Sequence, residues 1–365
     1  MKRGKPPQAV HRRAGWRPGA ARLYLACAVL APTLGACAPA VSTAAPLPLP
    51  SPDWVQVYFT VPEDFTGEYR GGVDEAIVDS LNAARHTVDV ACLEINLYSI
   101  SRALIRAADR GMRVRVVVDS TYLDARALGD LEHAGLPVLG DRREGLMHDK
   151  FIVIDTALVW TGSMNLSLSD TYRNNNNMLR IESADLAQAY QREFEEMFVD
   201  DIFGAESKRG RPAAPLGFGE VSLEVYFSPD DAPAGRLLQV LARAQKTIRF
   251  LAFSLTSDDI AGMLVQQARR GVEVSGVMEE SQVRSNANGK YEVLRAAGLD
   301  VHLDGNPRNM HHKVIIVDDE WVVTGSYNFS YNAENVNDEN LLIIHDADLA
   351  QRYLEEFKRV RAQAQ

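Results

Sequence analysis

The sequence predicts an α/β protein built from two duplicated, layered domains. The duplication shows in short matches about 160 residues apart: residues 56–60 (QVYFT) match residues 224–228 (EVYFS), and Arg110-Gly111 matches Arg270-Gly271. Within each copy, β-type apolar runs alternate with helix-type segments, which is typical of layered α/β domains. A chain of 365 residues is long enough for two such domains. We therefore expect the same order of strands and helices to occur twice.

The expected elements follow from apolar runs, their period and the glycines that interrupt them. Helix 100–110, for example, is expected to end at Gly111, because glycine readily adopts the left-handed conformation of a helix terminus. The first half is expected to contain strands 56–60, 87–93, 113–118, 136–139, 148–154 and 177–181 and helices 71–85, 100–110, 124–134 and 184–198. The second half is expected to contain strands 224–228, 247–253, 272–278, 311–317 and 340–345 and helices 257–270, 288–297 and 347–361.

The N-terminal region is predicted to direct export. Residues 1–36 have the features of a signal peptide: seven basic residues, no acidic residue and an apolar run too short to span a bilayer as a helix. The tetrapeptide LGAC ending at Cys37 resembles a bacterial lipobox, so Cys37 is the predicted site of lipid attachment. Residues 37–53, rich in Ala and Pro, are interpreted as a tether. We expect an extracytoplasmic, membrane-anchored lipoprotein; a plain secreted protein and an uncleaved anchor are the alternatives.

The globular part is predicted to divide into a first domain at 54–203 and a second at 220–361. The Gly/Pro-rich segment 204–219 is the predicted linker. Without the seven basic residues of 1–36, 32 basic residues face 49 acidic ones, a net charge of about −17. This charge disfavours a nucleic-acid partner, since non-specific affinity for nucleic acids comes largely from Lys and Arg. Cys92, in an apolar run, is expected to be buried as a small hydrophobic residue.

One motif, H-x-K-x4-D-x6-G-S-x-N, occurs twice without a gap, 163 residues apart. Its residues in the two copies are His148 and His311, Lys150 and Lys313, Asp155 and Asp318, Ser163 and Ser326, and Asn165 and Asn328. Because side chains alternate along a strand, the His and Lys of each copy share one face. The Asp of each copy has the opposite parity, so we expect it to be a structural partner. His312 also has the opposite parity and is not expected to be catalytic.

The two motifs together supply two imidazoles, two ammonium groups and four neutral donors. That set suits a tetrahedral oxyanion, on which charge must be stabilised as it develops. It lacks the cysteines or paired carboxylates of a zinc or magnesium site, so neither a metal nor another cofactor is expected. Two histidines can also share a two-step displacement through a phosphohistidine, one as nucleophile and one as general acid and then base. A pair of chance core lysines is disfavoured, because burying an unpaired charge is costly.

The motif pair resembles the double HKD signature of the phospholipase D superfamily, and the resemblance covers about residues 54–361. It implies two α/β/α sandwich halves with a metal-independent active site at their pseudo-twofold interface. It implies that His148 and His311 are nucleophile and general acid/base, with His148 preferred as the nucleophile. The phosphate-binding residues that it implies are Lys150, Lys313, Asn165 and Asn328, supported by Ser163 and Ser326.

Members of the superfamily also carry a glutamate downstream of the motif that orients a catalytic histidine. The second half has Glu339, whereas the first half departs from the pattern with Asn176 in the equivalent place. We expect Glu339 to contact His311, to raise the pKa of that histidine and so to suit it to the acid role. Glu94, at the end of strand 87–93, is the second candidate for an orienting group.

The leading hypothesis for the substrate is a phosphatidylcholine-like phospholipid, hydrolysed to phosphatidic acid and a free alcohol at a membrane surface. An extracytoplasmic endonuclease and a phosphatidyltransferase of the same superfamily are the alternatives. A catalytically dead binding module is disfavoured, because both motifs are intact. Since one chain carries both motifs, a monomer is expected to be functional.

Overall fold

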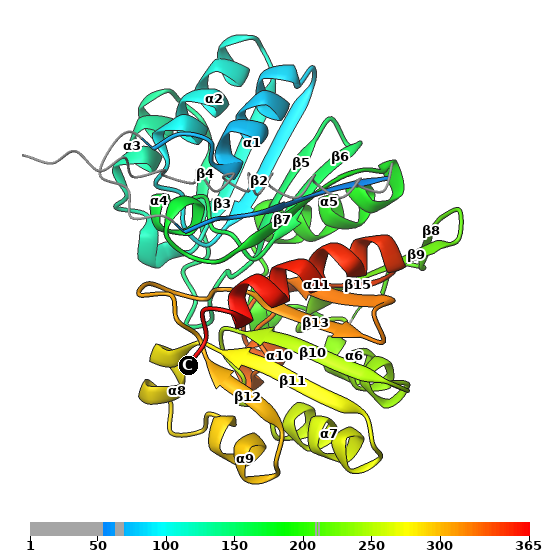
Figure 1. Cartoon of the computed structure of the whole chain (residues 1–365). Helices are drawn as coiled ribbons and strands as arrows, with labels where there is room; N and C mark the ends of the chain where they lie inside the picture. The colour runs from blue at the N-terminus through cyan, green and yellow to red at the C-terminus, as the bar shows by residue number, and fades with distance from the viewer. Residues whose placement is uncertain (1–53, 63–68, 209, 211) are drawn as a thin grey trace, which may run out of the picture. The chain divides into compact units, whose positions relative to one another are not determined.

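The computed structural model describes residues 54–62, 69–208, 210 and 212–365, and in them two β-sheets repeat one topology (Figure 1). The predicted signal peptide, Cys37 and the tether lie outside the described residues. In the described part of the chain, no helix combines the length and the apolar character that crossing a bilayer requires.

The first half contains a seven-stranded sheet in the order β1-β7-β6-β5-β2-β3-β4. Its strands are β1 (Val55–Phe59), β2 (Thr87–Cys92), β3 (Arg113–Val118), β4 (Val138–Gly140), β5 (Lys150–Ile154), β6 (Leu158–Gly162) and β7 (Asn177–Glu182). Its helices are α1 (Val73–Ala83), α2 (Tyr98–Asp109), α3 (Arg126–His133), α4 (Leu168–Tyr172) and α5 (Ala184–Phe198), with a 3-10 turn η1 (Ser120–Tyr122). The pairs β2–β3 and β3–β4 are parallel, and the other pairs are antiparallel.

The second half repeats this order and adds one strand, in the order β12-β11-β10-β13-β14-β15-β9-β8. Its strands are β8 (Leu216–Phe218), β9 (Val221–Ser228), β10 (Thr247–Ala252), β11 (Glu273–Met278), β12 (Asp300–Leu303), β13 (Lys313–Val317), β14 (Trp321–Gly325) and β15 (Glu339–His345). Its helices are α6 (Pro233–Ala242), α7 (Asp258–Arg269), α8 (Glu280–Ser285), α9 (Tyr291–Ala296), α10 (Tyr331–Asn335) and α11 (Ala347–Arg361). The 3-10 turn η2 (Gly204–Glu206) and β8 lie within the segment predicted as a linker.

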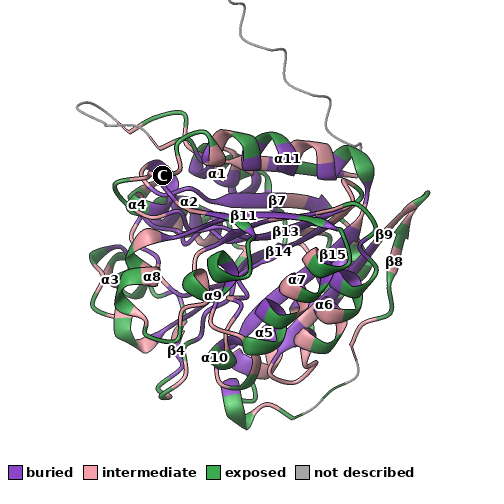
Figure 2. Cartoon of the chain, turned by 60° about the horizontal axis from the view of Figure 1, so that its bottom comes forward, coloured by how far each residue is buried: buried purple, intermediate pink, exposed green. Residues whose placement is uncertain are grey.

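The packing is layered, and α5 and α11 lie between the two sheets (Figure 1). One buried cluster joins residues of both sheets to these helices, for example Val153 of β5, Val314 of β13 and Tyr190 of α5. Two outer clusters join each sheet to helices on its other face: α1, α2 and α3 in the first half, α6, α7 and α9 in the second. Figure 2 shows the strands buried and the outer sides of the helices exposed. Each half is thus an α/β/α sandwich, as predicted.

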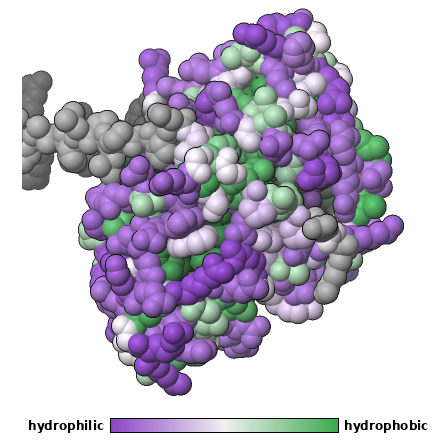
Figure 3. All heavy atoms as spheres, turned by 90° about the vertical axis from the view of Figure 1, so that its right-hand side faces the viewer, coloured by the Kyte–Doolittle hydropathy of each residue, from purple (hydrophilic) through white to green (hydrophobic). Residues whose placement is uncertain are grey.

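The surface is consistent with this layering. On the face drawn in Figure 3, hydrophilic residues predominate and hydrophobic ones lie between them. Cys92 is buried in the outer core of the first half, as predicted.

The strand after each motif strand, β6 or β14, was not expected. The turn between β5 and β6 contains Asp155 and Thr156, both with positive φ (53° and 52°), and the matching turn contains Asp318 and Asp319 (53° and 59°). Two successive residues with positive φ make a tight hairpin turn, which usually carries Asn or Gly. Because neither turn has a glycine, the sequence offered no strong hairpin signal at this place.

Candidate active site

The motif strands β5 and β13 are buried on both faces, because each is central in its sheet. Phe151 and Val153 point into the core between the sheets, and Ile152 and Ile154 into the outer core of the first half. Lys150 has the parity of the outer residues and is only 1% exposed. Lys313, also 1% exposed, has the same place on β13. The register of these strands therefore sets where the motif side chains emerge.

The two halves exchange backbone hydrogen bonds beside the motif histidines. The His148 N–H donates to Asp338 O (2.9 Å), and the His311 N–H donates to Asn175 O (2.9 Å). Isolated bridges pair Met147 with Asp338 and Asn175 with Met310. Each histidine is therefore placed against the segment that enters β15 or β7 of the opposite half.

This crossing decides the partner of Glu339. Its Oε2 lies 2.6 Å from Nδ1 of His148, not of His311. The expectation that Glu339 contacts His311 is therefore wrong. The physical reason is the exchange of backbone hydrogen bonds, which places the start of β15 beside the first motif instead of its own.

His311 faces different groups. Its Nδ1 lies 2.9 Å from Oδ1 of Asn176 and 3.7 Å from Oδ1 of Asp170. The Phe253 ring stands edge-on to the imidazole, with ring centroids 4.6 Å apart. Sequence reasoning noted Asn176 only as a departure from the pattern and did not find Asp170 or Phe253. An acidic residue opposite Ala333 of the second half was the signal for Asp170.

The electrostatics show that these groups share one site. Burial lowers the pKa of His148 well below 6.5, and Lys150 and Lys313 lower it further. Burial and Lys313 likewise lower the pKa of His311, and Lys150 and His148 add to the effect. The expectation of a raised pKa beside Glu339 is therefore wrong, because burial and two ammonium groups dominate. Burial raises the pKa of Glu339 itself to about 8.

The two lysines are buried cations with unfilled donor capacity. Lys150 Nζ donates to the carbonyl oxygen of His148, and Lys313 Nζ donates to that of His311 (2.7 Å). An ammonium has three N–H donors, and the described residues supply a hydrogen-bond acceptor to one of them in each case. Burial lowers the pKa of both lysines, most strongly for Lys313, which also feels Lys150. An anion bound between them would relieve this repulsion.

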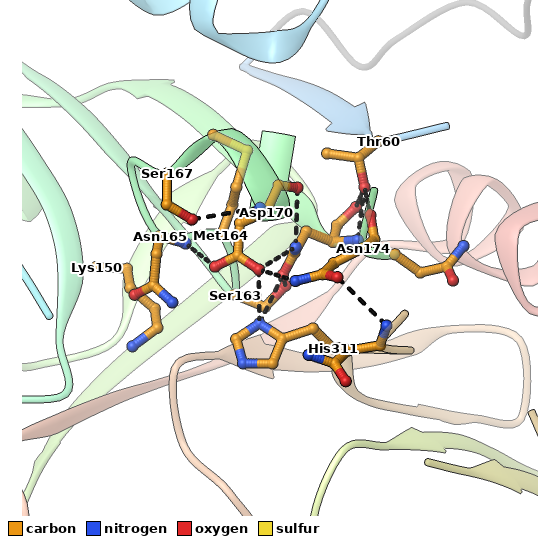
Figure 4. Close-up of polar contacts among 12 residues, drawn as sticks. Thr60, Lys150, Ser163, Met164, Asn165, Ser167, Asp170, Asn174 and His311 are labelled. Atoms are coloured by element: carbon orange, nitrogen blue, oxygen red, sulfur yellow. Dashed lines mark hydrogen bonds and ion pairs between the residues drawn. The ribbon is translucent and has the colours of Figure 1, made fainter. Parts of the chain in front are cut away.

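The motif asparagines also keep unused polar atoms. Asn165 is buried, and its Oδ1 has no hydrogen-bond partner among the described residues. The same holds for Oδ1 of Asn328. In Figure 4, the side chains of Asn165 and Lys150 lie side by side near His311. Both asparagines are therefore available to a bound group.

The motif serines are turned inward. Ser163 Oγ donates to Asn176 Oδ1 (2.9 Å) and accepts from the Asn177 N–H (3.1 Å). Ser326 Oγ accepts from the Asn340 N–H (2.9 Å). Their glycine neighbours permit this close packing: a Cβ on Gly162 would come 2.2 Å from Asn177 O. The glycines thus serve the approach of β7 and β15 to the motif.

Asp155 and Asp318 lie at the other end of their strands. Asp155 accepts the backbone N–H groups of residues 85, 86 and 87 at 2.7–2.9 Å, ahead of β2. Asp318 accepts those of residues 245, 246 and 247 at the same distances, ahead of β10. These three hydrogen bonds lower the pKa of Asp155 against the effect of its burial. Both carboxylates therefore tie the hairpin turn to a neighbouring strand.

The middle residue of each H-x-K triplet points to the core between the sheets. Asp149 Oδ1 accepts from Asn340 Nδ2 (2.6 Å), and His312 Nδ1 accepts from Asn177 Nδ2 (3.0 Å). His312 Nε2 then lies 2.8 Å from Glu356. Each asparagine comes from the opposite half, so these buried groups join the halves.

Glu94 lies near the site without contacting either motif histidine. Its Oε1 accepts from Asn96 Nδ2 (2.5 Å). Burial and Asp170 raise its pKa. Among the described residues, no group of three or more His, Cys, Asp or Glu side chains could hold a metal ion.

Comparison with known proteins agrees with this arrangement. Residues 77–198 and 237–361 match the model of the family described as cardiolipin synthase, PLD-like domain. A phospholipase D of Rickettsia typhi is 34% identical over 134 residues, which is 37% of this chain and 65% of that protein. A mitochondrial cardiolipin hydrolase of Xenopus tropicalis is 35% identical over 119 residues, 32% of this chain and 57% of that protein. The alignments thus span less than two thirds of either relative.

One solved structure extends the comparison to the whole fold. A phosphatidylserine synthase of Haemophilus influenzae superimposes over 85% of this chain and 87% of its own, with a TM-score of 0.62 and 15% identity. At that identity the likeness concerns the fold alone.

Proposed function

Because both of its halves match the family model, this chain belongs to the cardiolipin synthase, PLD-like domain family of the phospholipase D superfamily, and we propose that it cleaves a phosphodiester bond of a phospholipid. The observation that carries this proposal is the meeting of His148, His311, Lys150 and Lys313 in one buried site. Two buried ammonium groups with unfilled donors suit a phosphate oxyanion.

In the proposed first step, Nε2 of His148 attacks phosphorus, and the bond from phosphorus to the leaving oxygen breaks. His311, protonated at Nε2, gives its proton to that oxygen, and the alcohol leaves. In the second step water attacks the phosphohistidine while His311 takes its proton, and the N–P bond breaks to give phosphatidic acid. Lys150, Lys313, Asn165 and Asn328 hold the non-bridging oxygens.

The contact of His148 with Glu339 supports its role as the nucleophile. When Nε2 bonds to phosphorus, the ring becomes cationic. A carboxylate oxygen 2.6 Å from Nδ1 is placed to compensate that charge, in a site where little water screens it.

The lipid substrate is supported by the names of the relatives, which are phospholipase D and cardiolipin hydrolase. The net charge of about −17 without residues 1–36 also speaks against a polyanionic substrate. Lipid attachment at Cys37 would hold the site at a bilayer, and Cys37→Ser would then release the protein from the membrane fraction.

A second candidate is transfer of the phosphatidyl group to another alcohol. The family description, cardiolipin synthase, favours it. An alcohol can replace water in the second step without any change in the groups that act. The ratio of transfer to hydrolysis would then depend on which acceptor reaches the phosphohistidine.

The test uses the purified protein in EDTA with mixed micelles of phosphatidylcholine or cardiolipin, and separately with DNA and RNA. We expect release of choline or phosphatidic acid, and its loss in His148→Asn and in His311→Asn. His133→Asn, at an exposed histidine of α3, is the matched control and is expected to keep full activity. Cleavage of nucleic acid with inert micelles would reject the lipid proposal, and loss of activity in EDTA would reject the metal-independent mechanism.

The same assay with added glycerol or phosphatidylglycerol separates the two lipid candidates. Formation of a new phosphatidyl ester identifies transfer, and phosphatidic acid alone identifies hydrolysis.

A further inference from the structure

The two halves carry their downstream acid at different positions. Glu339 stands 28 residues after His311, where the first half has Asn176. Asp170 stands 22 residues after His148, where the second half has Ala333. A carboxylate that is missing at one position of the first half is therefore present at another position of the same segment.

Asp170 lies next to the histidine of the opposite half. It belongs to α4, is 3% exposed, and its Oδ1 lies 3.7 Å from Nδ1 of His311. Figure 4 shows its carboxylate directed at the His311 ring. Nδ1 of His311 thus faces an amide oxygen at 2.9 Å, from Asn176, and a carboxylate just beyond it.

Asp170 also fixes the orientation of that amide. Asn176 Nδ2 donates to Asp170 O (3.1 Å) and to Asp170 Oδ1 (3.2 Å), while Ser163 Oγ donates to Asn176 Oδ1 (2.9 Å). With Nδ2 directed at two acceptors, Oδ1 must face His311. Since an amide oxygen only accepts, Nδ1 carries the proton of the neutral ring, and Nε2 keeps its lone pair for the site.

Asp170 remains ionised although it is buried. Burial by itself would raise its pKa, but His311, the hydrogen bond from Asn174 Nδ2 (2.5 Å), that from the Asn165 N–H (2.8 Å) and Lys313 together lower it. The site therefore holds a buried negative charge beside His311, and the same carboxylate anchors the backbone of Asn165.

We propose that Asp170 is the positioning residue of His311: through Asn176 it holds the tautomer with hydrogen on Nδ1, and through its charge it stabilises the imidazolium that protonates the leaving oxygen. This inference rests on the proposed function. In the second half, Glu339 combines both tasks in one contact with His148. In the first half, an amide orients the ring and a carboxylate one step behind supplies the charge.

The other charged groups around His311 make this charge matter. Lys313 on β13, Lys150 on β5 and His148 all disfavour the imidazolium, and Asp170 favours it. Glu279 faces the same segment and accepts the Met310 N–H (2.6 Å). Replacing Asp170 by a neutral residue should therefore lower the pKa of His311 and reduce the fraction that can act as an acid.

The test uses the full-length protein and two short-chain phosphatidyl esters, one of choline and one of p-nitrophenol. Choline needs a proton as it leaves, whereas p-nitrophenolate leaves without one. In Asp170→Asn we expect the first turnover of the choline ester to slow about tenfold or more, a part of what a general acid contributes. The alkaline limb of its rate profile should move to lower pH, while the first turnover of the p-nitrophenyl ester changes little.

The second half supplies the rescue. Asp170→Ala combined with Asn176→Glu gives the first half the same residues as the second half at both positions. We expect Asp170→Ala alone to be slow with the choline ester and the double variant to recover most of the rate and the pH profile. Ser169→Ala, at an exposed position of the same helix, is the fold control and should leave both esters unaffected.

Two outcomes would overturn the inference. One is a folded double variant as slow as Asp170→Ala; the other is an equal slowing of both esters by Asp170→Asn, which would mark a merely structural role. If the wild type cleaves neither ester, the proposed function fails separately. The imidazole pKa of His311, measured by NMR in wild type and Asp170→Asn, then decides the inference alone: a fall supports it, and an unchanged value rejects it.

Discussion

His148 and His311 stand at equivalent places of the two halves, yet their Nδ1 atoms face unlike partners. His148 meets a carboxylate oxygen of Glu339 at 2.6 Å. His311 meets the amide oxygen of Asn176 at 2.9 Å, with the carboxylate of Asp170 3.7 Å away. In both cases the partner comes from the opposite half. The duplicated backbone geometry has been kept, while the side chains that set the electrostatics have diverged.

The difference teaches how a symmetric scaffold can support two unequal roles. A nucleophile needs a compensating charge when its ring becomes cationic, and a direct carboxylate provides it. A general acid must also release its proton and regain it, so a less direct carboxylate is an advantage. The four predictions that follow test this contrast.

The largest effect is expected from the histidines themselves. His148→Asn and His311→Asn should each lower steady-state turnover by about 10⁴-fold or more, because both steps need both groups. With the p-nitrophenyl ester, His311→Asn should still form the covalent phosphatidyl adduct on His148, which intact-mass spectrometry detects. An adduct in His148→Asn instead would reverse the two roles.

Replacement of Glu339 should have the next largest effect. Glu339→Gln removes the charge that compensates the cationic ring, and its amide can donate to Nδ1 and shift the proton to Nε2, which blocks attack. We expect kcat to fall by about 10²- to 10⁴-fold, toward the loss seen when the carboxylate behind a catalytic histidine becomes an amide. Formation of the adduct in a stopped-flow burst measures it. A smaller loss than in Asp170→Asn would contradict the contrast between the halves.

The lysines should separate activity from stability. Lys150→Met and Lys313→Met each remove a donor to the phosphate, so kcat should fall by about 10²- to 10³-fold. Each also removes a buried charge, so the free energy of unfolding should rise by about 1 kcal/mol or more. Because burial lowers the pKa of Lys313 further than that of Lys150, its replacement should stabilise more. Urea unfolding measures this, and a loss of stability in both variants would assign the lysines a structural role.

The smallest effect concerns Asp149, whose counterpart is His312. Burial raises the pKa of Asp149 from 3.8 to about 7. Between these values the folded state holds a proton that the unfolded state has lost, so this group's contribution to stability is present below about pH 4 and falls as pH rises to about 7. Asp149→Asn should therefore stabilise the protein at pH 8 and flatten the change in urea midpoint between pH 5 and pH 8. An unchanged difference in midpoint would show that Asp149 ionises normally.

Much of the fold followed from local patterns. The helices 184–198 and 347–361 have the predicted bounds, because amphipathic period and polar N-caps are local properties. The sharing of one face by His148 and Lys150 followed from strand periodicity. The hairpin strands β6 and β14 and the helix α6 were missed, since their turns lack glycine or their apolar runs are short.

The sequence by itself determined the duplication, the two motifs, the order of elements and hence the chemical groups of the site. Only the tertiary structure decided which histidine meets which acid. The reason is that the halves exchange backbone hydrogen bonds at Asp338 and Asn175, so each histidine is surrounded by residues of the other half. Pairing across such a seam depends on distances between segments 135 to 191 residues apart in the chain, which no local period records.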